Sequence, residues 1–79
     1  MSLAETLADD LAAKVIAHVE RTGDEDIVGI IASALGDSSQ TLQEAFVTSV
    51  RVQRAAIRAE KLLMRRIETY PTAGAPRDG

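Results

Sequence analysis

Five basic side chains, spaced three or four residues apart, are the clearest candidates for chemistry in this sequence. They are Arg51, Arg54, Arg58, Lys61 and Arg65. Such spacing places side chains on one face of a helix, so these residues form a single line, here called the basic line. Repulsion within it costs a few tenths of a kcal/mol per pair, which favours an acidic counterpart. The basic line can meet carboxylates of a neighbouring helix or partner protein, nucleic-acid phosphates or an anionic membrane surface. Alternatively, it is simply solvated.

Side chains suited to catalysis or metal binding are scarce. The sequence has no cysteine and one histidine, His18. No serine lies in a glycine-flanked nucleophile elbow, and one histidine with carboxylates is too small a set for zinc. The glycines at 23, 29 and 36 are too widely separated for a phosphate-binding loop. We therefore predict no enzyme, no metal site and no cofactor, and we expect His18 to be structural, at the edge of the core.

The basic line lies in a stretch, residues 39–70, that contains neither glycine nor proline. This length predicts one helix of roughly 45 Å. The half of the helix circumference that faces away from the basic line is largely apolar. It carries two neighbouring lengthwise lines of side chains, here called seams. The first seam comprises Ala45, Ser49, Val52, Ala56, Ala59, Leu63, Ile67 and Tyr70, and the second comprises Leu42, Phe46, Val50, Ile57 and Met64. Gln53 and Glu60 interrupt this half, either as exposed boundary residues or as polar residues that set the register of an oligomer.

Two shorter helices are predicted before the long one. Ser2 and Glu5 have the spacing of a capping box, and Gly23 suits the end of the first helix. Acidic residues 24–26 open the second helix, and Gly36 is expected to close it. The fold class is therefore all-α, with helices at about 3–21, 25–35 and 39–70 in a single helical domain of residues 1–70. Residues 71–79 are expected to form a disordered tail.

The apolar half of the long helix is wider than two short helices can cover, so we predict an oligomerising helical bundle. A short chain without cysteines can also bury more apolar surface by pairing with a second copy. A homodimer is favoured, and a monomeric bundle with a frayed third helix is the alternative. The expected interface residues are Ala45, Val52, Ala56, Ala59, Leu63 and Ile67.

Charge is distributed unevenly along the chain. Residues 1–44 carry −7 and residues 45–79 carry +4, for a net charge of −3. The two halves can attract each other, within or between chains, or the basic half can meet an anionic partner. No apolar run reaches the length of a membrane span, no secretory signal is evident, and the lack of cysteine fits a cytoplasmic location. Only Phe46 and Tyr70 are aromatic, which disfavours a base-stacking surface.

One corner of the chain has a recognisable pattern. A small residue, Ala32, precedes a glycine, Gly36, and an apolar residue, Leu42, follows in the next helix. In these features residues 31–46 resemble the helix-turn-helix of bacterial DNA-binding regulators. By that resemblance, the residues facing DNA would be Ser38, Ser39, Gln40 and Gln43.

The sequence thus supports two hypotheses of function. The first is a small, non-catalytic helical interaction or regulatory module that acts as a homo-oligomer and binds another protein. The second is a helix-turn-helix DNA-binding transcriptional regulator. Salt-sensitive binding to duplex DNA would favour the second hypothesis.

Overall fold

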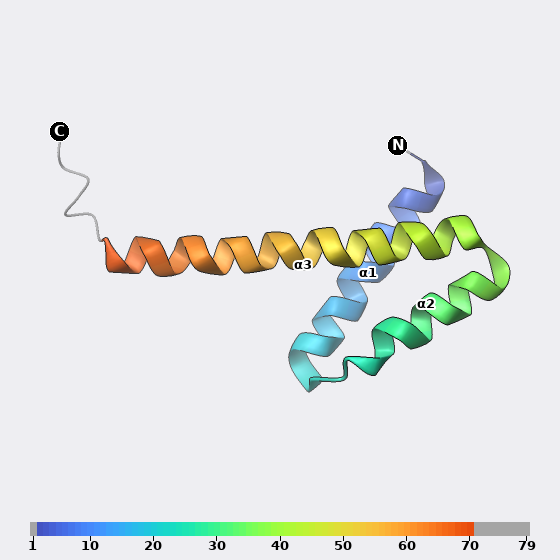
Figure 1. Ribbon diagram of the computed structural model, residues 1–79, viewed down its shortest axis with the longest axis horizontal. Coiled ribbons are helices and arrows are strands. Elements are labelled where there is room, and N and C mark those ends of the chain that lie inside the picture. The colour runs from blue at the N-terminus through green and yellow to red at the C-terminus, as the bar shows by residue number, and fades with distance from the viewer. Residues whose placement is uncertain (1, 71–79) are drawn as a thin grey trace.

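The computed structural model describes residues 2–70, and these form three helices (Figure 1). Helix α1 spans Leu3–Thr22, α2 spans Asp26–Ser38 and α3 spans Gln40–Thr69. The predicted all-α fold with a dominant C-terminal helix is confirmed. The expected tail at residues 71–79 lies outside the described residues.

The helix starts follow the capping signals in the sequence. The Glu5 backbone N–H donates to Ser2 Oγ at 3.1 Å, and the Ser2 N–H donates to Glu5 Oε1 at 3.3 Å, which completes the capping box. Gly23 ends α1 with φ of 78°, in the left-handed region that favours glycine. Ser39 caps α3 by accepting a hydrogen bond from the Leu42 N–H.

The end of α2 corrects one prediction. Gly36 does not close this helix, which continues to Ser38. Unlike Gly23, Gly36 does not adopt the left-handed conformation that ends a helix. A Cβ at Gly36 would lie 2.8 Å from Gln43 Cδ, so the glycine leaves space at this position. The Gln43 side chain lies against Gly36 and donates from Nε2 to the Ala32 carbonyl at 3.0 Å. Gly36 therefore provides space for a side chain of α3, and the chain turns at Ser39 instead.

The core forms where α1 and α2 pack on the N-terminal half of α3. Phe46 is its largest fully buried side chain, with no exposed surface. The other buried apolar residues are Ala8, Ala12, Val15, Ile16, Val19 and Val50. The second seam of α3 therefore enters the core only in its first part, and Met64 at the far end is half exposed.

Helix α3 continues well past the ends of α1 and α2, as Figure 1 shows. The radius of gyration is 17.3 Å, against roughly 12 Å for a compact chain of this length. The molecule is also thin, with extents of 57 × 31 × 13 Å. One half of its longest helix therefore projects from the core without contact to α1 or α2.

Candidate interaction surface

The projecting half of α3 is exposed over its full circumference. Every residue from Arg58 to Tyr70 is exposed. Its large apolar side chains keep half or more of their surface in solvent, namely Leu62, Leu63, Met64, Ile67 and Tyr70. Because apolar surface of this extent is rarely left uncovered on a soluble monomer, this half of α3 is the candidate interaction surface.

The first seam runs along this surface. Of the predicted interface residues, Ala45 is half-buried, and the other five are exposed, namely Val52, Ala56, Ala59, Leu63 and Ile67. At 100° per residue, these six side chains lie on one face of α3, about 160° from the basic line. The core face lies between the two. Ser49, which also belongs to this seam, is buried against α1, and from Val52 onward no described residue covers the seam. Its contact with a second copy stays a prediction.

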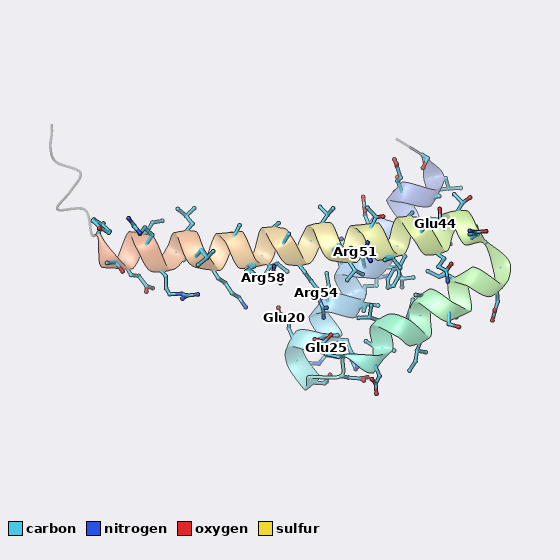
Figure 2. All side chains as sticks on the ribbon, viewed as in Figure 1. Glu20, Glu25, Glu44, Arg51, Arg54 and Arg58 are labelled. Carbon is cyan, nitrogen blue, oxygen red and sulfur yellow. The ribbon has the colours of Figure 1, made fainter. Side chains whose placement is uncertain are left out.

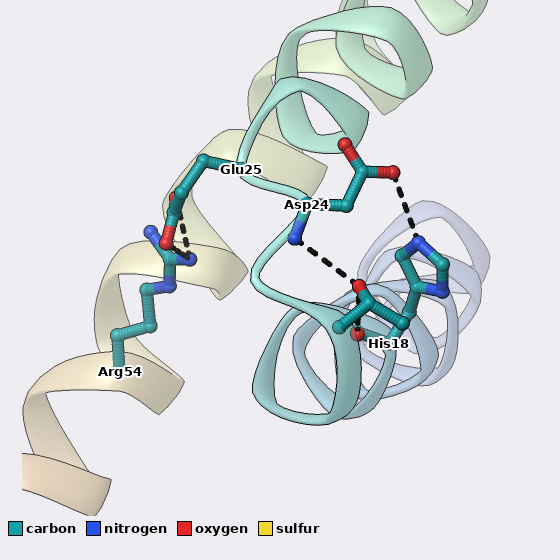
Figure 3. Close-up of polar contacts among 5 residues, drawn as sticks. His18, Asp24, Glu25 and Arg54 are labelled. Atoms are coloured by element: carbon teal, nitrogen blue, oxygen red, sulfur yellow. Dashed lines mark hydrogen bonds and ion pairs between the residues drawn. The ribbon is translucent and has the colours of Figure 1, made fainter.

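Among the described residues, the basic line has one ion-pair partner. Arg54 Nη2 lies 2.9 Å from Glu25 Oε1 and 3.0 Å from Glu25 Oε2, so it tethers the start of α2 to α3 (Figure 3). One acidic residue of the N-terminal half thus meets the line. Within residues 2–70, Arg51, Arg58, Lys61 and Arg65 form no ion pair.

A cleft of about 340 Å³ opens beside this tether, where α1 ends and α3 continues. Arg54, Arg58 and Lys61 line one side, and Glu20 and Glu25 line the other. Figure 2 shows Glu20 and Glu25 below α3, near Arg54 and Arg58. Acidic and basic walls face each other here, so the acidic N-terminal half already screens part of the basic line.

A polar cluster at the crossing of α1 and α3 was not predicted. Ser49 is only 6% exposed and donates from Oγ to Asp9 Oδ1 at 2.6 Å. Gln53 donates from Nε2 to the Asp9 carbonyl at 3.1 Å and to Ser49 Oγ at 3.0 Å. The sequence signal was the pair Ser49 and Gln53, four residues apart in an apolar half. Gln53 thus occupies a boundary position between two helices, the simpler of its two interpretations.

A groove of about 640 Å³ lies beside this cluster, between the first turns of α1 and the N-terminal half of α3. Its lining includes Ala4 and Glu5 of α1, and Glu44, Ala45 and Val52 of α3. Ala45 and Val52 belong to the first seam, so the groove and the exposed seam form one continuous surface along α3.

The four residues implicated by the helix-turn-helix resemblance have different environments. Ser39 is used as the cap of α3, and the Gln43 amide is bonded to Ala32 of α2. Gln40 donates from Nε2 to Glu44 Oε2 at 3.2 Å, while Ser38 is exposed. Two of the four side chains therefore stabilise the corner between α2 and α3 in this conformation.

His18 has a polar contact at the end of α1. Its Nε2 lies 3.0 Å from Asp24 Oδ2, and Asp24 also donates its backbone N–H to Thr22 Oγ1 at 3.1 Å (Figure 3). The imidazole is partly buried, and the contact joins α1 to the loop before α2. Within residues 2–70, no three metal-ligating side chains gather into a possible ion site.

None of the three helices combines the length and apolar composition needed to cross a membrane. No protein-family model matches the sequence. Searches of curated proteins and of solved structures likewise give no match. The exposed surfaces of α3 are therefore the features that bear on function.

Proposed function

We propose that this protein is a small, non-catalytic helical interaction module that self-associates through the first seam of α3 and binds an acidic protein through the basic line. One observation carries the proposal. The C-terminal half of α3 presents a continuous apolar seam on one face and unpaired basic residues on the opposite face, and neither is covered within residues 2–70.

The two faces suit different partners. The seam is apolar and rich in alanine near its middle, so it suits a close helix–helix contact. The basic line keeps Arg51, Arg58, Lys61 and Arg65 free within the described residues, and these suit carboxylates of another protein. An oligomer built on the seam would therefore leave the basic line accessible on its outer side.

Self-association is tested by measuring solution mass. Sedimentation equilibrium at micromolar concentration should give a multiple of the 8.4 kDa chain mass, and Ala56→Arg should shift it to the monomer. Ala56 is exposed, so this change should leave the helical fold intact. A wild type that remains monomeric up to 100 μM would refute the self-association part of the proposal.

Partner binding is tested by reversing the charge of the line. Arg51, Arg58 and Arg65 are changed together to Glu, while Arg54 is kept because it holds Glu25. A protein recovered with the wild type should be lost with the triple variant and should be released by salt.

DNA binding remains the alternative, and substitutions of Gln40 and Gln43 test it. Sequence-selective binding to duplex DNA that requires Gln40 and Gln43 would support a regulator instead. We rank it second because Gln43 is already hydrogen-bonded to Ala32.

A further inference from the structure

We infer that two copies pair antiparallel, so that the C-terminal half of each α3 lies in the groove between α1 and α3 of the other copy. This inference rests on the proposed self-association and goes further by fixing the orientation, the register and the second binding surface. Three observations support it: the sizes of the seam side chains, the position of the groove, and the charges at the two ends of α3.

The sizes of the seam residues favour the antiparallel arrangement. The seam begins with small Ala45, has alanines at its middle, and ends with large Tyr70. An antiparallel register centred between Ala56 and Ala59 places each of these alanines against the other in the second copy. The same register places Val52 opposite Leu63, and Ala45 opposite Tyr70. A parallel pair would instead place Tyr70 against Tyr70 and Ala45 against Ala45, crowded at one end and loose at the other.

The groove lies where the antiparallel partner would extend. From Ala45 to Tyr70 the seam is about 38 Å long, so the groove along Ala45 and Val52 is opposite the last turns of the second α3. A strip of this length and about 10 Å wide covers roughly 400 Å² per copy, about half of a standard interface. The α1 wall of the groove supplies further contact area. In a parallel pair the projecting halves would contact only each other.

The charges of the two ends agree with this orientation. Residues 2–13 and 40–50, which surround the groove, contain four acids and no base. Residues 55–70 contain four bases and two acids; three of the bases belong to the basic line, and the fourth, Arg66, lies closer to the seam. An antiparallel pair brings the acidic end of one copy to the basic end of the other, twice per dimer, whereas a parallel pair brings like charges together. Arg66, which lies 4.7 Å from the Tyr70 ring centre, would enter this acidic region beside Tyr70.

The absence of cysteine makes the orientation directly measurable. Ala45→Cys and Tyr70→Cys are prepared as single variants, oxidised alone, and oxidised after mixing in equal amounts. If the pair is antiparallel, either variant alone should crosslink little. After random exchange about half of the dimers in the mixture contain one copy of each variant, and these should form the disulfide. Peptide mass spectrometry should identify a bond between positions 45 and 70. Thr69→Cys replaces Tyr70→Cys as the control, because Thr69 is equally exposed but lies off the seam.

The outcomes separate this inference from the proposed function. A wild type that is monomeric in the same buffer refutes self-association and the arrangement together. A wild-type dimer whose single variants crosslink efficiently by themselves is parallel, which overturns the inference and leaves self-association standing. A dimer that forms no bond between positions 45 and 70, or that crosslinks as well through Thr69→Cys, also overturns it.

Discussion

Shortening Leu63 to alanine tests whether the first seam is the contact surface. Leu63 is 57% exposed in the single chain, so about half of its burial free energy is still to be gained. Full burial of a leucine contributes about 1.5–3 kcal/mol, so the remaining half contributes about 1 kcal/mol per copy. A dimer contains two copies, and Leu63→Ala should therefore weaken it by about 2 kcal/mol, roughly a 30-fold rise in Kd.

Leu62 provides a matched control for this experiment. It is the neighbouring residue, has the same type and is also 57% exposed, but it points about 100° away from Leu63 around the helix. Leu62→Ala should change the Kd less than twofold. Neither leucine is in the core, so both variants should keep the helical circular dichroism of the wild type. Sedimentation equilibrium over a concentration series gives the Kd values. Equal weakening by both variants would show nonspecific association and refute the argument for a defined seam.

Other substitutions test the fold by chemical denaturation. Phe46→Ala should destabilise the fold by about 3–5 kcal/mol, enough to unfold much of so small a domain, because Phe46 is fully buried. Gly29→Ala should stabilise it by about 0.5–1 kcal/mol, because a Cβ there meets no atom within 4 Å and alanine is the better helix former; no gain would contradict this account. Ser49→Ala should cost about 1 kcal/mol through loss of the bond to Asp9, and Asp9→Asn should cost less because it retains an acceptor.

The positions of the helices were predictable because their signals are local. The capping box at Ser2 and the glycine at position 23 each act within one turn, and both are confirmed. The end of α2 was missed because glycine at position 36 was taken as a helix terminator, whereas the helix continues to Ser38. Glycine is a common helix terminator, but Gly36 instead leaves space for the Gln43 side chain.

The type of contact between helices was predictable, but the residues that make it were not. The uneven charge indicated that acids would meet the basic line, and Glu25 does meet Arg54. Which acid would be the partner depends on how the helices cross, and sequence spacing does not report that geometry. The contact between His18 and Asp24 likewise depends on the path of the loop.

The projecting half of α3 must remain helical without packing against α1 or α2. Residues 55–69 are mostly alanine, leucine, methionine, arginine, lysine and glutamate, which are strong helix formers, and they include no glycine or proline. They also extend a helix already nucleated on the core, so they avoid the unfavourable first turn that limits short isolated helices. The surface is therefore already shaped before a partner arrives, and less conformational entropy is lost on binding. Local helix propensity keeps this surface ordered, and burial of its exposed apolar seam would favour the binding of a second copy.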